Sequence, residues 1–437
     1  MLWSLVAVLA LAFTARVLAA LDGFDARVGS DADMYERLAA HLYTTGEFGL
    51  PGSANTYDFA PGIPYFAAAV YNLVGDADPE AARLGLAVAG TVAVLVVYLL
   101  ARRLGGQRAG LVAAAVAALY PPTLFYAGIL SGEPLAMLTV AAAVLGLLWA
   151  ADPGRSPWAW ALPGALLGLT AYLRPEYVAL TALLALVVLV VVALRSGALR
   201  GAFAAGLVAL TCAVVVAPWA VHASSENGRF VPVSTGGGKA LFIGTYLPGD
   251  GIHDNVKQHL LHRLRGGPPI PEEQLRRIPM NPLLDRVALR HPELPRDAAL
   301  GRVGRENLAR WSRSEPRAVA QMLAGKVTHM WNGAGAPSAR PPGAALHFAV
   351  LALGLAGLAL LVARRRWEAI PIVALLCGIS LIGALLLAGT RRNLPVMPLV
   401  IAVAGVGAVA AADLVRERIA RRRTAKREPI ESVLAPR

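Results

Sequence analysis

Cysteine and charge are both scarce in this sequence. Two cysteines occur among 437 residues, Cys212 and Cys377, and both fall inside apolar runs. The sequence therefore indicates neither a disulfide framework nor a thiolate metal site, so any metal ligand would have to be oxygen or nitrogen. Charged residues make up only 16% of the chain, against about 25% in ordinary soluble domains. This scarcity argues against a soluble protein.

Acidic residues are the scarcer charged group, with 28 Asp and Glu against 41 Lys and Arg and a formal net charge of +13. In a soluble protein such an excess would suggest binding to nucleic acid. Here, however, the basic residues fall mainly between the apolar runs, where they report membrane topology. We therefore expect membrane lipids as partners and no nucleic acid.

Long apolar runs are what the sequence has in abundance, since 56% of its residues are hydrophobic. Crossing the hydrocarbon core of a bilayer takes about 20 helical residues, and several runs reach or approach that length: 2–21, 81–100, 178–194 and 369–388. The first run lacks the basic region of a cleavable signal peptide, which favours a retained signal anchor. The fold class predicted is a polytopic α-helical membrane protein.

The positive-inside rule assigns loops rich in Lys and Arg to the cytoplasm. Applied to the basic groups at 102–108, 195–200 and 364–366, it predicts about ten transmembrane helices with both termini inside. Four parts follow: an N-terminal transmembrane module (1–221) with a first outer loop (22–79), an extracytoplasmic domain (222–342), C-terminal transmembrane helices (343–414) and a basic cytoplasmic tail (415–437).

The outer segment 222–342 loses the apolar runs and gains Arg, His, Pro and Gly, which indicates a small extramembrane domain. Helices are predicted at 297–312 and 315–331, and short strands at 229–233 and 240–243, giving an α or α+β domain. In the first outer loop, the apolar stretch 61–75 is too short to cross and reads as a re-entrant or interfacial helix.

Three arginines fall at helix ends on the outer face, which the charge rule depletes of them: Arg174, Arg391 and Arg392. The guanidinium fork binds phosphate oxygens through two parallel hydrogen bonds. We therefore predict that these residues bind the phosphate of a lipid-linked substrate. The alternative is that they snorkel to lipid headgroups, and the same alternative holds for Arg16 within the first helix.

Three acids lie at the outer ends of helices, where the dielectric constant is low: Asp31, Asp33 and Glu133. Carboxylates in such places can be tuned to accept a proton, which makes these the candidate catalytic residues. The alternative is ordinary acidic charge at helix N-termini. Asp31 and Glu133 could also hold a divalent cation through oxygen, the one cofactor that the residues suggest.

Two further motifs are weak evidence for a phosphate or zinc site. The run Gly236-Gly237-Gly238-Lys239 lacks the spacing of a phosphate-binding loop and lies on the predicted outer side, so an ordinary turn is the better interpretation. The histidines of the outer segment, at positions 253, 259 and 262, lack the acid of the H-E-x-x-H zinc motif. A solvated helix face explains them better than zinc.

Five motifs follow one another along the chain. They are Asp31-x-x-x-Tyr35, Tyr57-Asp58-Phe59-Ala60-Pro61-Gly62, Ser131-Gly132-Glu133-Pro134, Leu173-Arg174-Pro175 and Arg392-Asn393-Leu394-Pro395. By these motifs the sequence resembles GT-C glycosyltransferases, in the branch of protein O-mannosyltransferase-like and aminoarabinose-transferase-like enzymes.

The resemblance implies an inverting transfer of sugar from a polyprenyl-phosphate donor on the outer face, with Asp31 as general base and Glu133 assisting. Arg16, Tyr35, Tyr57 and Lys239 are added as further substrate contacts. Protein O-mannosyltransferases usually carry Asp-Glu where this chain has Asp31-Ala32. The acceptor therefore stays open between an envelope glycan, a lipid and a protein.

Two other functions remain open. A secondary transporter or lipid flippase could also place charge along a membrane pathway, although no inverted repeat is visible and the outer domain is unexplained. A ligase or polymerase of lipid-linked glycans could equally use arginines on the outer face. High Ala and Arg content suggests a bacterial genome, which implies the inner membrane with an extracytoplasmic active site.

Overall fold

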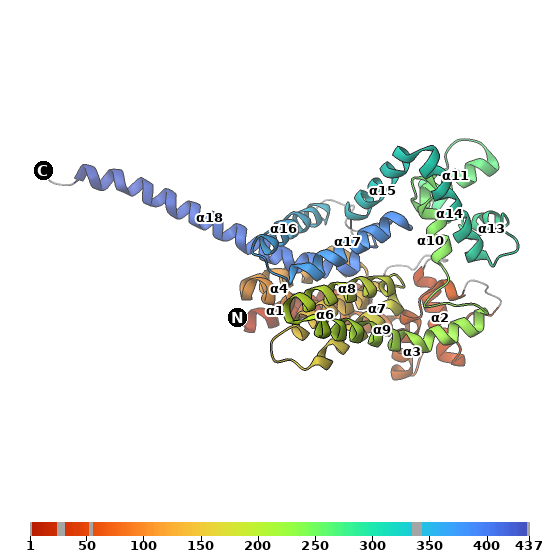
Figure 1. Ribbon diagram of the computed structural model, residues 1–437, viewed down its shortest axis with the longest axis horizontal. Coiled ribbons are helices and arrows are strands. Elements are labelled where there is room, and N and C mark those ends of the chain that lie inside the picture. Colours follow the sequence, from red (N-terminus) through yellow and green to blue (C-terminus); the bar gives the residue numbers. More distant parts are fainter. Residues whose placement is uncertain (1, 24–30, 52–55, 334–342, 435–437) are drawn as a thin grey trace.

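The computed structural model describes residues 2–23, 31–51, 56–333 and 343–434. Figure 1 shows a bundle of long helices lying side by side, with a group of shorter helices at one end. The N-terminus and the projecting end of the last helix both lie at the opposite end of the bundle. The parts of the predicted loop, outer domain and tail at 24–30, 52–55, 334–342 and 435–437 lie outside the described residues.

Within the described residues, seven helical segments are long and apolar enough to cross a membrane, judged by length and composition. They are α1 (Leu2–Asp22), α4 (Pro79–Leu119), α6 (Glu133–Ala150), α8 (Tyr177–Ser196), α9 (Ala198–Asn227), α16 (Gly343–Ala363), and the segment Leu394–Arg421, which joins η5 (Leu394–Val396) to α18 (Met397–Leu434). The prediction of a multi-pass helical membrane protein is confirmed.

Helix α4 is a pair of helices rather than one rod. At Gly106 the backbone leaves helical geometry, with φ 84° and ψ 179°, a conformation that only glycine adopts readily. The chain then folds back, and the second helix packs closely on the first. A Cβ at Gly110 would lie 2.9 Å from the ring of Tyr98. Two shorter apolar helices, α7 (Ala161–Leu173) and α17 (Ala369–Leu385), complete the bundle. That the chain crosses the membrane about ten times stays a prediction.

In the polar segment, residues 222–333 of the described chain, all the regular secondary structure is helical. Its helices are α10 (Gly237–Gly244), α11 (His253–Arg265), α12 (Glu272–Arg277), α13 (Asn281–Ala288), α14 (Arg296–Ser314) and α15 (Pro316–Trp331), with the short turn η3 (Leu247–Gly249). The helices predicted at 297–312 and 315–331 are thus confirmed as α14 and α15. They pack around a core of their own that includes Phe242, Leu284 and Val303.

The two strands predicted in the polar segment are wrong, because the described residues contain no strand, only an isolated bridge between Ile252 and Ala388. The apolar run 240–243 belongs to α10, which packs closely on α14: a Cβ at Gly304 would lie 3.0 Å from the Leu241 side chain. Asp297 also caps α10 by accepting the Lys239 backbone N–H at 2.9 Å. Such tertiary contacts override the strand preference of a short apolar run.

The first loop folds into α2 (Asp31–Thr45), a single turn η1 (Thr56–Asp58) and α3 (Gly62–Val74). A helix within 61–75 was predicted, and its position relative to the membrane stays a prediction. Gly62 lets α3 rest on the end of α7, since a Cβ there would lie 2.8 Å from the Tyr172 carbonyl oxygen. This close approach brings the first loop next to Arg174.

The predicted sidedness can be tested with single cysteines placed in a chain whose Cys212 and Cys377 are replaced by alanine. Ser312 in the polar segment and Ser156 in the turn after α6 are both exposed. On intact cells, a membrane-impermeant maleimide should label Ser312→Cys and spare Ser156→Cys until the cells are lysed. The reverse pattern would put the polar segment on the cytoplasmic side and contradict the predicted topology.

Candidate active site

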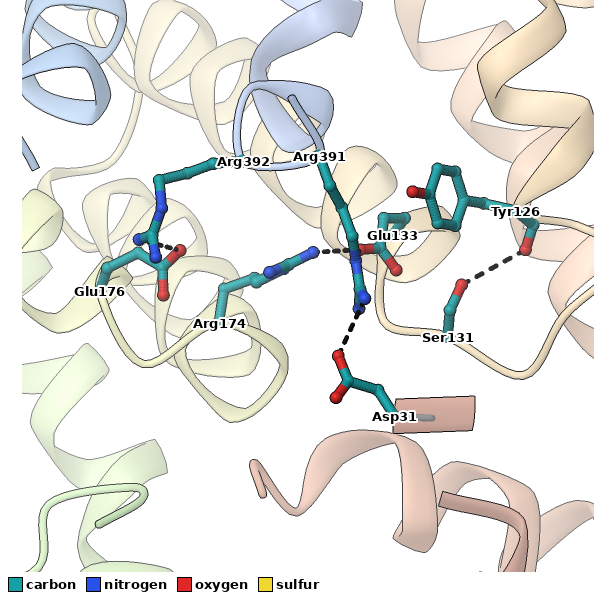
Figure 2. Close-up of polar contacts among 8 residues, drawn as sticks. All are labelled: Asp31, Tyr126, Ser131, Glu133, Arg174, Glu176, Arg391 and Arg392. Carbon is teal, nitrogen blue, oxygen red and sulfur yellow. Dashed lines mark hydrogen bonds and ion pairs between the residues drawn. The ribbon is translucent and has the colours of Figure 1, made fainter. Parts of the chain in front are cut away.

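Residues from four distant parts of the chain meet where the first loop approaches the end of the bundle. Asp31 begins α2, Glu133 begins α6 and Arg174 follows the last residue of α7. The fourth part is the turn between α17 and η5, residues 386–393, which we call the arginine loop because it carries Arg391 and Arg392. Figure 2 shows Asp31, Glu133, Arg174 and Arg391 pointing toward one another, with Arg392 turned toward Glu176.

Arg391 bridges two acids at the centre of this group. Its Nη1 donates to Asp31 Oδ2 at 2.9 Å, and its Nε donates to Glu133 Oε1. Arg174 donates to the same glutamate oxygen through Nη2. The Glu133 side chain is fully buried, whereas 55% of the Asp31 side chain is exposed. The buried acid therefore fixes the arginines, and the exposed acid faces outward.

The surroundings of Arg391 keep it charged and oriented. Burial alone would lower the pKa of Arg391, but the nearby carboxylates of Glu133 and Asp31 outweigh it and raise that pKa well above its ordinary value. The guanidinium also lies over the ring of Tyr126, 5.8 Å from its centroid. The Ser131 hydroxyl donates to the Tyr126 carbonyl at 3.4 Å and ties down the turn before Glu133 (Figure 2).

A second ion pair lies beside the first. Arg392 Nη1 donates to Glu176 Oε1 at 3.2 Å, and the two side chains are 15% and 14% exposed. Arg392 and Arg174 hold the pKa of Glu176 below its ordinary value despite burial, which acts in the opposite direction. The glutamate is therefore an anion, and this pair extends the charged surface along the end of the bundle.

The tyrosines of the site are poor candidates for a base. Burial, aided by the negative charge of Asp31, raises the pKa of Tyr35. Burial likewise raises the pKa of Tyr126 to about 12. Both phenols are therefore neutral near pH 7 and can only donate or accept hydrogen bonds. Asp31 is the exposed carboxylate in contact with the arginines.

The structure thus brings together Asp31, Glu133, Arg174 and Arg391, with Tyr35 buried beside them. Asp33 begins the same helix as Asp31, but two residues of α-helix rotate its side chain by about 200°. It therefore leaves the helix on a different face. Of the two predicted acids in α2, the contact with Arg391 singles out Asp31.

Arg16 lies apart from this group, inside the bundle. It is 2% exposed and donates to the carbonyl oxygens of Ala12, Ala117 and Ala118 and to the Thr123 hydroxyl at 3.0–3.2 Å. The interpretation that it snorkels to headgroups is wrong, because its guanidinium satisfies carbonyls at the end of α4. These contacts give Arg16 a structural role, and a contact with substrate stays a prediction.

Tyr57 and Lys239 lie at the junction between the first loop and the polar segment. The Tyr57 carbonyl accepts from the Thr235 N–H at 2.7 Å, and the Thr235 hydroxyl donates to Asp58 Oδ1 at 2.6 Å. The Tyr57 ring packs among aromatic residues, 5.9 Å from Trp219. Neither residue has a described contact with the arginines of the site, and their role as substrate contacts stays a prediction.

Sequence reasoning missed Glu176. It follows Arg174 and Pro175 at the start of α8, and it carries the same signal as Glu133, an acid at the end of an apolar helix on the side predicted to lie outside. That signal could have found it. Its pairing with Arg392, 216 residues away, could not have been read from spacing.

A divalent cation at Asp31 and Glu133 does not fit this arrangement. The two carboxylates share the Arg391 guanidinium, which occupies the position between them that a cation would need. The described residues contain no group of three or more His, Cys, Asp or Glu side chains able to hold a metal ion. The acids of this site are paired with arginine instead.

Comparisons with known proteins found a matching family model and similar solved structures. The family model for dolichyl-phosphate-mannose-protein mannosyltransferase matches residues 58–222. No curated protein matches the chain in sequence. Among solved structures, the archaeal oligosaccharyltransferase AglB from Archaeoglobus fulgidus, in complex with an inhibitory peptide and a dolichol-phosphate, is 16% identical with a TM-score of 0.58. The alignment covers 100% of this chain and 52% of AglB.

Two further structures are similar. The apo form of an oligosaccharyltransferase from Archaeoglobus fulgidus is 15% identical over 96% of this chain and 52% of its own, with a TM-score of 0.56. ArnT from Cupriavidus metallidurans bound to undecaprenyl phosphate is 18% identical over 95% and 80%, with a TM-score of 0.45. The chain spans about half the length of the oligosaccharyltransferase. Residues 58–222 therefore match the mannosyltransferase family model, and the chain shares its fold with the oligosaccharyltransferase.

Proposed function

We propose that this protein is an inverting membrane glycosyltransferase, which moves a sugar from a polyprenyl-phosphate donor to an acceptor outside the cytoplasm. The observation that carries the proposal is Arg391, held between the buried Glu133 and the exposed Asp31. The contact joins a guanidinium suited to phosphate and a carboxylate suited to accept a proton, which supports these two roles. The predicted bacterial inner membrane and outward-facing active site belong to the same proposal.

The lipid phosphate is the leaving group, and it accounts for the role proposed for the arginines. When the bond between the anomeric carbon and the phosphate oxygen breaks, the lipid phosphate gains negative charge and needs cations rather than a proton. Arg391 and Arg174 supply two guanidinium groups that Glu133 holds in place. A planar fork of donors suits phosphate oxygens better than the point charge of lysine.

The attacking group explains Asp31. An acceptor hydroxyl must lose its proton as its oxygen bonds to the anomeric carbon, and a carboxylate within hydrogen-bond reach can take that proton. Asp31 is exposed and held 2.9 Å from Arg391, so an acceptor could reach it from outside. One bond forms as the other breaks on the opposite face, and this single displacement inverts the anomeric centre.

The comparisons support the donor class. The similar AglB structure contains a dolichol-phosphate, which is itself a polyprenyl phosphate. The matched family is described by a dolichyl-phosphate sugar donor, and the match includes Glu133 and Arg174. A transporter or flippase would share the membrane helices, but it has no need of an exposed carboxylate paired with a phosphate-binding arginine.

An assay with the purified protein in liposomes separates these functions. The liposomes contain a sugar-labelled undecaprenyl phosphate, or the diphosphate-linked oligosaccharide, and receive an envelope extract holding glycans, lipids and proteins. We expect label to pass from the monophosphate donor to the extract. Movement of the donor across the bilayer without transfer would indicate a flippase. Transfer from the diphosphate donor alone would indicate a ligase.

A further inference from the structure

The arginine loop is supported from the polar segment at its C-terminal end. Asn393 is fully buried, and its Nδ2 donates to the carbonyl oxygens of Met330 and Gly333 at 2.8 Å each. Met330 lies in the last turn of α15 and Gly333 just beyond it. One side-chain amide therefore fastens the loop to two carbonyls that the end of α15 leaves without partners.

The same helix also holds the start of the loop. Lys326, fully buried in α15, donates through Nζ to the Ala384 carbonyl in α17 at 2.6 Å and to the Gly244 carbonyl in α10 at 2.7 Å. Ala388 forms a bridge with Ile252 of the polar segment. Figure 1 shows α15 running toward the end of α17. Both ends of the arginine loop are thus tied to the polar segment.

Asn393 stands two residues from the side chain that bridges the acids. Between the two ties the loop has few backbone hydrogen bonds: the Arg392 N–H donates to the Gly389 carbonyl at 3.0 Å, and the Leu394 N–H to the Arg391 carbonyl at 3.3 Å. Small displacements of a catalytic group of about 1 Å reduce rates by roughly 10²-fold. The loop therefore needs an outside support to keep Arg391 on Glu133.

We propose that Asn393 is a positioning residue, which holds the arginine loop on α15 so that Arg391 is set to bind the lipid phosphate. The phosphate role rests on the proposed function, and the holding of the loop does not. A hydrogen bond between α15 and α17 provides a matched control. Trp331 Nε1 donates to Ser380 Oγ at 3.0 Å, so Ser380→Ala removes an α15–α17 hydrogen bond without touching the loop.

The first experiment follows amide hydrogen exchange in peptides covering residues 386–397 of the full-length protein without ligand. Asn393→Ala should speed exchange of these peptides at least tenfold, and Asn393→Leu should do the same, because it keeps the volume but has no donor. Ser380→Ala should leave them unchanged. Wild-type exchange in both Asn393 variants would overturn the proposal, whatever the protein binds.

The second experiment measures the affinity for undecaprenyl phosphate in detergent. Asn393→Leu should weaken binding about tenfold in the wild-type background, whereas Ser380→Ala should not change it. In an Arg391→Ala background the same Asn393 substitution should add less than a twofold loss, because residues that act through one another are not additive. An undiminished tenfold loss in that background would show that Asn393 does not act through Arg391.

The two experiments separate the two proposals. If the wild-type protein fails to bind undecaprenyl phosphate, the proposed donor is wrong, and hydrogen exchange alone decides whether Asn393 holds the loop. If binding is normal and faster exchange is seen without any loss of affinity, the loop is held by Asn393 but Arg391 does not depend on it. That outcome would overturn the positioning role.

Discussion

Replacing Asp31 with asparagine should abolish sugar transfer while leaving the protein folded and able to bind the lipid phosphate. Asparagine keeps the size of the side chain and an oxygen that can accept from Arg391, but its amide cannot accept the proton of the acceptor hydroxyl. Loss of a general base reduces turnover by about 10²–10⁴-fold. The measurement is the rate of label transfer from a sugar-labelled undecaprenyl phosphate, with binding of undecaprenyl phosphate measured on the same preparation.

Asp33→Asn is the matched control, since it makes the same chemical change two residues along the same helix. Its turnover should stay within a fewfold of the wild type. Full loss in Asp33→Asn together with near-normal turnover in Asp31→Asn would move the base to Asp33 and contradict the role given to the Arg391 contact.

Replacing Arg391 with alanine should produce the second large loss, in both donor binding and turnover. The guanidinium contacts both acids of the site, and it lies where the departing phosphate is proposed to bind. Removing a fixed group that stabilises developing charge reduces turnover by about 10²–10³-fold. Arg391→Lys should restore only part of this, because an ammonium group lacks the planar fork.

Arg392→Ala provides the comparison for Arg391. This neighbour pairs with Glu176 and has no described contact with Asp31 or Glu133, so its loss should weaken donor binding less than the loss of Arg391. Thermal unfolding of both variants separates folding from binding. Equal affinity for undecaprenyl phosphate in the wild type and in Arg391→Ala would mean that the arginine serves only the structure of the site.

The general fold was predictable because a bilayer allows few backbone structures to cross it. Long apolar runs have few alternatives to membrane helices. Shorter apolar runs are ambiguous, which is why 240–243 was misread as a strand: its helical state depends on glycines that let α10 pack on α14 and on the cap from Asp297. Neither contact can be seen in the run itself.

The site was predictable as a set of residues but not as an arrangement. Asp31, Glu133, Arg174 and Arg391 each violated an expectation of charge or sidedness, and the structure brings all four together. That Arg391 reaches Glu133, 258 residues away, depends on how the helices pack. Arg16 violated the same expectation for another reason, since buried carbonyls at a helix end also require donors.

The anomeric configuration of the product tests the central claim most directly. The wild-type protein would be given an undecaprenyl-phosphate sugar of known anomeric configuration and an envelope acceptor, and the glycosidic linkage formed would be read by NMR. A single displacement with Asp31 as base predicts the inverted configuration in every product molecule, and transfer about 10²–10⁴-fold slower in Asp31→Asn. Retained configuration, or a near-wild-type rate in Asp31→Asn, would contradict the mechanism proposed for this site.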